Sequence, residues 1–153
     1  MNVEHEIDIL LIEDNPHEAK LAIRSFQKSN LANRLLHLAD GMEALDFIFA
    51  KNKYSSRKIE CLPKLILLDL KLPKVSGLEI LKAVKEDERT RIIPIIVLTS
   101  SREEPDIIAS YKLGVNSYIV KPVNFESFTK AVVELGMYWM FLNVPPILPT
   151  HLP

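Results

Sequence analysis

Five polar residues of this chain lie where apolar runs end, and together they could support phosphoryl chemistry. They are Glu13, Asp14, Asp69, Thr99 and Lys121. Carboxylates a few ångströms apart repel each other by roughly 4 kcal/mol per close pair at an effective dielectric constant of 20, and one lysine cannot neutralise three of them. A divalent cation can do so, and hard carboxylate oxygens favour Mg²⁺. The residue types therefore predict a magnesium site.

A phosphoryl group transferred to one of these carboxylates would find all the partners it needs. The metal screens the charge of the phosphoryl oxygens, the Lys121 ammonium contacts one of them, and the Thr99 hydroxyl accommodates another. Asp69 is the expected acceptor, because it stands alone at the end of "KLILLD". Glu13 and Asp14 are adjacent and form the expected metal-binding pair.

Short apolar runs alternate with segments of helical periodicity and predict the elements that position these residues. Strands are expected at 7–12, 34–39, 64–70, 92–101 and 116–122. Helices are expected from Pro16 with Asn15 as N-cap, over 40–52, over 76–88, over 104–114 and over 124–143. Five successive β–α units predict an α/β fold with a doubly wound parallel sheet and helices on both faces. Because ligands bind at the carboxyl ends of such strands, the polar residues should meet there.

The composition describes an ordinary globular protein. The chain has 153 residues, of which 48% are hydrophobic and 25% charged, with a formal net charge of −1. This balance indicates one domain and gives no sign of a nucleic-acid surface or a polybasic membrane anchor. The N-terminus lacks the basic start of a secretory signal, and no segment is long enough to span a membrane. The lone Cys61 favours a reducing, cytoplasmic setting.

The ordered motifs "LLIEDNP", "LILLDLKLPKVSG", "IIVLTSS" and "YIVKP" resemble the receiver domain of two-component response regulators, over essentially the whole chain. The resemblance implies a flavodoxin-like sheet with strand order 2-1-3-4-5. It also implies that Asp69 is the phosphoacceptor, with a histidine kinase as the phosphodonor. Mg²⁺ would be bound by Asp14 directly, by Glu13 often through water, by Asp69, and by the backbone carbonyl of Lys71.

The same resemblance assigns the remaining site residues. Thr99 matches the switch hydroxyl and Tyr118 the switch aromatic, which turns inward when Asp69 is phosphorylated and so changes a protein-binding face. Lys121 matches the phosphate-binding lysine, and its bond to Pro122 is typically cis in the family. The Lys71 side chain departs from the family pattern. We hypothesise that it crowds the water that hydrolyses the phosphoryl group.

The ends and insertions of the chain suggest how the signal is passed on. We expect a single receiver domain over 1–153, with an extended C-terminal helix and Pro-rich tail at about 124–153 and no output domain. The core stripe of the last helix should contain Phe125, Phe128, Val132, Leu135, Trp139 and Leu142. A second apolar face predicts a homodimer, with a tail folded over its own domain as the alternative; this face comprises Val133, Met137, Met140, Phe141 and Val144.

The segment 51–63 is longer than a usual connection and is expected to be a surface loop, with a partner-contacting loop as the alternative. Together with the aromatic, proline-ended C-terminus, it most resembles the stand-alone response regulators that partner phytochrome-type histidine kinases.

Other functions fit the sequence less well. A phosphatase of the haloacid dehalogenase type needs a second acid two residues after the nucleophile, where Lys71 stands. An FMN-binding flavodoxin is disfavoured because "EDN" after the first strand would repel a phosphate, and a dinucleotide site lacks its Gly-rich turn. Two alternatives remain open, namely a pseudo-receiver that binds partners without phosphorylation and a phosphorelay intermediate.

Overall fold

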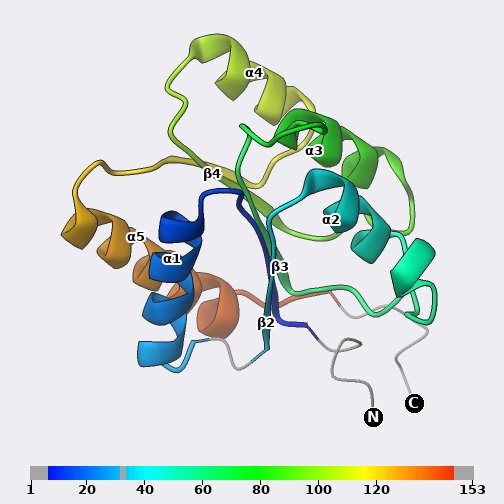
Figure 1. Ribbon diagram of the computed structural model, residues 1–153, viewed down its shortest axis with the longest axis horizontal. Helices are drawn as coiled ribbons and strands as arrows, with labels where there is room; N and C mark the ends of the chain where they lie inside the picture. The colour runs from blue at the N-terminus through cyan, green and yellow to red at the C-terminus, as the bar shows by residue number, and fades with distance from the viewer. Residues whose placement is uncertain (1–6, 32–33, 147–153) are drawn as a thin grey trace.

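The computed structural model describes residues 7–31 and 34–146 and contains one five-stranded parallel sheet (Figure 1). The strands are β1 (Ile9–Ile12), β2 (Leu35–Leu38), β3 (Leu65–Leu68), β4 (Ile95–Thr99) and β5 (Ser117–Val120). Their order in the sheet is β2-β1-β3-β4-β5. The predicted α/β fold, parallel sheet and strand order are confirmed.

The three inner strands are the ones whose sequences are apolar without interruption. Every residue of β1, β3 and β4 is buried, whereas β5 is partly exposed along its length and β2 is buried only at Leu38. Successive side chains point to opposite faces, so Leu10 and Ile12 join one core while Ile9 and Leu11 join the other. Burial on both faces explains why these strands show no polar alternation.

Helices cover both faces of the sheet (Figure 1). The helices are α1 (Pro16–Lys28), α2 (Gly41–Ile48), α3 (Gly77–Glu86), α4 (Glu104–Lys112) and α5 (Phe125–Met137). Helices α1 and α5 lie side by side and pack on the core that contains Ile9, whereas α2 and α3 pack on the opposite core. Within residues 7–31 and 34–146, no helix is long and apolar enough to cross a membrane.

The helix starts are fixed by side-chain caps of residue types that are typical of N-caps. Asn15 and Asn124 each accept two backbone N–H groups at the first turns of α1 and α5. Asp40 does the same for α2, and Ser76 forms a capping box with Glu79 at α3. The caps at Asn15, Asp40 and Asn124 place these helix starts shortly after the ends of β1, β2 and β5, at the edge of the sheet where the polar residues gather.

The C-terminal helix differs from the sequence prediction. After α5 the chain continues as a π-helix, η3 (Tyr138–Leu142). Of the expected core stripe, Phe128, Val132 and Leu135 are buried, but Phe125 is 62% and Leu142 is 73% exposed. The prediction was wrong for these last two residues. Phe125 is the first residue of α5, and the wider π-helical turn before Leu142 shifts the side-chain register away from the 3.6-residue period.

The segment 51–63 is only partly the surface loop that its polar sequence suggested. It contains a short 3₁₀-helix, η2 (Asn52–Tyr54), and both Tyr54 and Arg57 are buried. The Tyr54 hydroxyl donates to Glu43 Oε1 at 2.7 Å, and Arg57 donates to the Phe47 carbonyl while its guanidinium stacks on the Phe47 ring. These contacts attach the segment to α2.

Candidate functional site

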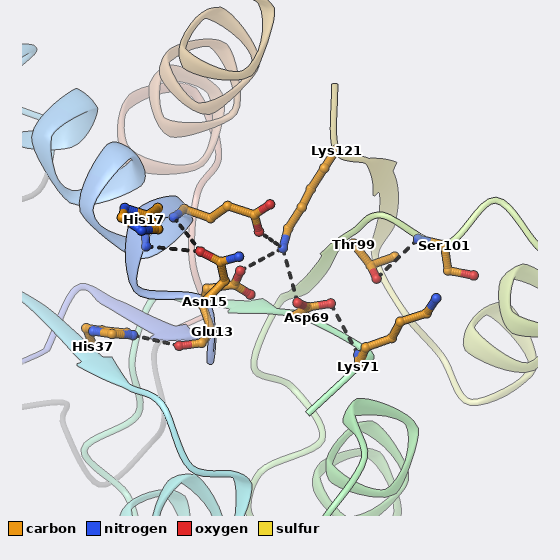
Figure 2. A network of polar contacts seen from close by, with 10 residues as sticks. Glu13, Asn15, His17, His37, Asp69, Lys71, Thr99, Ser101 and Lys121 are labelled. Carbon is orange, nitrogen blue, oxygen red and sulfur yellow. Dashed lines mark hydrogen bonds and ion pairs between the residues drawn. The ribbon is translucent and has the colours of Figure 1, made fainter. Parts of the chain in front are cut away.

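The site lies at the carboxyl edge of the sheet, where β1, β3, β4 and β5 end. It brings together all five residues that the sequence singled out, namely Glu13, Asp14, Asp69, Thr99 and Lys121. Figure 2 shows all of them except Asp14. Gly77 allows this geometry, because a Cβ atom there would lie 2.3 Å from the Asp69 carbonyl oxygen. The Gly77 amide instead donates to the Leu70 carbonyl at 2.9 Å. The chain can therefore turn tightly behind Asp69.

The Lys121 ammonium lies among the carboxylates of this site and contacts three of them (Figure 2). Its Nζ lies 2.7 Å from Glu13 Oε1 and 3.1 Å from Asp69 Oδ2, and it also contacts Glu18 Oε2. The lysine, Glu13 and Asp69 are all buried. Burial of an unpaired charge would be very costly, so the ammonium and the carboxylates stabilise one another.

The acidic residues fit a divalent cation. One carboxylate oxygen from each of Glu13, Asp14 and Asp69 lies within 4.8 Å of the others, with Asp14 exposed and the other two buried. A hard cation such as Mg²⁺ prefers carboxylate oxygens and keeps several of its waters, so a half-open cluster of this kind suits it. The backbone carbonyl of Lys71, which the resemblance also assigned as a ligand, stays a prediction.

The electrostatics of the cluster reflect the burial and the close spacing of its carboxyl groups. Burial, reinforced by Glu18 and Asp69, raises the pKa of the Glu13 carboxyl well above its usual range. Burial also tends to raise the pKa of Asp69, but contacts with Glu13, Lys121 and Thr99 outweigh it and hold that pKa below its usual range. Ionisation in the metal-free site is therefore favoured at Asp69 and disfavoured at Glu13. Asp69 is thus already in the form that can act as a nucleophile.

The residues beyond the acidic cluster surround Asp69 on the side of β4. The Thr99 hydroxyl accepts a hydrogen bond from the Ser101 amide at 3.4 Å, and the Tyr118 hydroxyl donates to the Ser101 carbonyl at 3.0 Å. Tyr118 is half-buried and packs against the core on which α2 and α3 lie. Thr99 and Tyr118 are thus linked through the backbone of a single residue.

Lys71 contacts Asp69 through its backbone rather than its side chain. Its amide donates to Asp69 Oδ1 at 3.2 Å, which orients the carboxylate. The side chain is exposed, and Figure 2 shows it extending away from Asp69 toward the β4 side of the site. The role of this side chain in shielding the phosphoryl group stays a prediction.

Two features of the site differ from what the sequence suggested. Glu18, in the first turn of α1, contacts Lys121 but was not among the predicted site residues. An acidic residue in a first turn is normally explained by the helix dipole, so only its position five residues after Glu13 could have pointed to the site. Secondly, residues 7–31 and 34–146 contain no cis peptide bond, so the Lys121–Pro122 bond is trans. The expected cis bond is not observed, and the ammonium reaches Asp69 without it.

Comparisons with known proteins agree with this geometry. Residues 9–133 match the response regulator receiver domain. Response regulator Rcp1 of Synechocystis is 37% identical over 86% of this chain and 88% of its own, and a probable methanogenesis regulatory protein, FilR2 of Methanothrix harundinacea, is 39% identical over 95% and 92%.

Solved structures of related proteins have the same fold. The Mn²⁺-bound form of Rcp1 superposes with a TM-score of 0.84 at 36% identity, covering 90% of this chain and 97% of that one. The phosphorylated cyanobacterial phytochrome response regulator RcpA superposes with a TM-score of 0.86 at 34% identity, covering 92% and 99%. With its matching fold and acidic site, the chain belongs to the response regulator receiver domain family.

Proposed function

We propose that this protein is a response regulator that accepts a phosphoryl group on Asp69 in a Mg²⁺-dependent reaction. The observation that carries this proposal is the contact of the Lys121 ammonium with Asp69 Oδ2 at 3.1 Å, beside the acidic group of Glu13, Asp14 and Asp69. A lysine and a cation-binding cluster on either side of one carboxylate supply what phosphoryl transfer to that carboxylate requires.

In the proposed reaction Asp69 is the nucleophile and a phosphohistidine of a kinase is the donor. An Asp69 carboxylate oxygen attacks the phosphorus, a P–O bond forms, and the P–N bond breaks. The electron pair of that bond stays with the imidazole nitrogen. Proton exchange with water then leaves the kinase histidine as a neutral imidazole. Lys121 neutralises charge on the phosphoryl oxygens, while Glu13, Asp14 and Asp69, with the Lys71 carbonyl, would hold Mg²⁺. When bound, the cation screens the remaining oxygens.

Phosphorylation would act through Thr99 and Tyr118. The Thr99 hydroxyl would turn to a phosphoryl oxygen, and the segment around Ser101 would follow it. The hydrogen bond from Tyr118 to the Ser101 carbonyl would then break and free the ring to turn inward. This would alter the surface formed by α4, β5 and α5, to which another protein could bind. The contacts through Ser101 support this route.

The partner that fits best is a histidine kinase of the phytochrome type. RcpA is described as a phytochrome response regulator, and AtBRR, which is 46% identical over 91% of this chain with a TM-score of 0.68, as a bacteriophytochrome response regulator. We place the reaction in the cytoplasm, where such kinases obtain ATP. Onward transfer from Asp69 in a phosphorelay would use the same site.

We also propose that the protein forms a homodimer through α5 and η3. Met137, Phe141 and Val144 are exposed, as a contact face requires, whereas Val133 and Met140 are partly buried against their own core. The prolines at 145 and 146 line a pocket of about 170 Å³ with Leu62 and Ile93, so the start of the tail lies on its own domain. Light scattering tests the dimer: the mass of one chain for the wild type would exclude it, and Phe141→Glu should dissociate it.

The phosphoacceptor is tested with acetyl phosphate. Incubation of the wild type in Mg²⁺ should add the mass of one phosphoryl group, whereas EDTA or Asp69→Asn should prevent the addition. Asp69→Asn is a close match in shape, and we expect it to keep the fold. A wild type that stays unmodified with both acetyl phosphate and its kinase would support the pseudo-receiver alternative. Binding of BeF₃⁻ gives an independent measure of the same site.

A further inference from the structure

The Lys121 ammonium has no free hydrogen atom to offer a phosphoryl group. An ammonium carries three N–H donors, and the three carboxylates around Lys121 engage all of them. To bind a phosphoryl oxygen, Lys121 must therefore release one of Glu13, Glu18 and Asp69. Which carboxylate it releases determines how easily the site accepts an anion.

Glu18 differs from the other two partners of Lys121 in both position and exposure. It comes from the first turn of α1, and it is not one of the three acids whose oxygens lie within 4.8 Å of one another. Its side chain is 35% exposed, against 4% for Glu13 and 8% for Asp69. Water can therefore solvate the Glu18 carboxylate when Lys121 leaves it, but cannot do so for the other two.

We propose that Glu18 is a positioning residue that competes with the phosphoryl group for Lys121. This inference rests on the function proposed above. In the site without a phosphoryl group, Glu18 accepts one of the three hydrogen bonds that Lys121 can donate, although Glu18 is not part of the acidic cluster. When a phosphoryl group arrives, the Lys121–Glu18 pair is the one that opens, and the ammonium turns to the phosphoryl oxygen.

The competition lowers the apparent affinity of the site for anions. A site that must first break an internal contact binds its ligand more weakly, in proportion to the fraction of molecules in which the contact is open. Because Glu18 is partly exposed, the pair is weaker than a fully buried one. Its removal should therefore tighten anion binding by about fivefold rather than by orders of magnitude.

The test uses BeF₃⁻, an analogue of the phosphoryl group, titrated in Mg²⁺ into the full chain. Glu18→Gln should lower the apparent dissociation constant about fivefold and speed the reaction with acetyl phosphate by a similar factor. Glu126→Gln is the matched control, because Glu126 is also a first-turn acid but lies on α5 and is exposed. It removes the same charge and should leave both values unchanged.

Glu18→Asp separates contact with Lys121 from long-range charge. It keeps the charge but shortens the side chain by one methylene, so it should bind BeF₃⁻ as tightly as Glu18→Gln. Wild-type affinity in Glu18→Asp, or unchanged or weaker binding in Glu18→Gln, would overturn the inference. Urea unfolding of each variant checks the fold, and a merely structural role would lower stability without tightening binding. If the wild type itself neither bound BeF₃⁻ nor reacted with acetyl phosphate, the proposed function would fail instead.

Discussion

Replacing Glu13 by Gln should stabilise the metal-free protein, and the gain should grow as the pH rises. Glu13 is only 3% exposed and shares its surroundings with Asp69 and Glu18, so its ionised form is disfavoured in the folded state. In the unfolded chain the same carboxyl ionises near its ordinary pKa of 4.5. Gln keeps the shape and the hydrogen-bonding capacity of a protonated Glu but cannot ionise.

The sign of the effect follows from the raised pKa of Glu13. Between pH 5 and pH 8 the folded state keeps the proton that the unfolded state has lost, so the free energy of unfolding falls as the pH rises. One proton corresponds to at most about 1.4 kcal/mol per pH unit. The Lys121 ammonium, whose Nζ lies 2.7 Å from Glu13 Oε1, relieves part of this penalty, so we expect a loss of about 2 kcal/mol over the whole interval.

The measurement is urea unfolding of the wild type and Glu13→Gln in EDTA at pH 5, 6, 7 and 8. The difference between the two proteins cancels the titration of all other groups, and it should widen with pH in favour of Glu13→Gln. In saturating Mg²⁺ the wild type should lose this slope, because the cation stabilises the ionised carboxylate. If the free energies of unfolding of the two proteins in EDTA changed with pH in parallel, the reasoning would be refuted.

Three further substitutions test other parts of the structure. Lys71→Ala should speed loss of the phosphoryl group from Asp69 about two- to fivefold, since one flexible side chain excludes water only in part; an unchanged dephosphorylation rate would reject this role. Gly77→Ala should lower the free energy of unfolding by about 3 kcal/mol and slow phosphorylation, because its Cβ would lie 2.3 Å from the Asp69 carbonyl oxygen; wild-type stability in urea would contradict this. Tyr54→Phe should cost about 1 kcal/mol through the lost bond to Glu43, and an unchanged urea midpoint would show that this bond contributes nothing.

The sequence predicts the main features of the fold and most of the site for one physical reason. Strands buried on both faces must be continuously apolar, so the polar residues that end them are conspicuous. Asp69, Thr99 and Lys121 were placed correctly by this argument, because the carboxyl ends of parallel strands meet at one edge. The caps at Asn15 and Asn124 could also be predicted from the sequence, because each side chain binds backbone N–H groups only two and three residues further on.

The parts that the sequence did not predict depend on contacts between distant residues. Glu18 looks like an ordinary first-turn acid until Lys121, 103 residues away, is seen beside it. Arg57 belongs to a polar segment and is buried only because the Phe47 ring and carbonyl receive it. Leu142 fits a helical stripe, but a π-helical turn moves it out of register. Periodicity carries no information about such long-range pairs or about a change in helix type.

The central claim is that Asp69 is the residue that accepts the phosphoryl group, and mapping the modified residue tests it most directly. Borohydride reduces an aspartyl phosphate, and tandem mass spectrometry of the digested protein then locates the reduced residue. After reaction with acetyl phosphate in Mg²⁺, the reduced residue should be Asp69 alone, and EDTA should abolish it. Reduction at Glu13, at Asp14 or at another carboxylate, with Asp69 intact, would contradict the account.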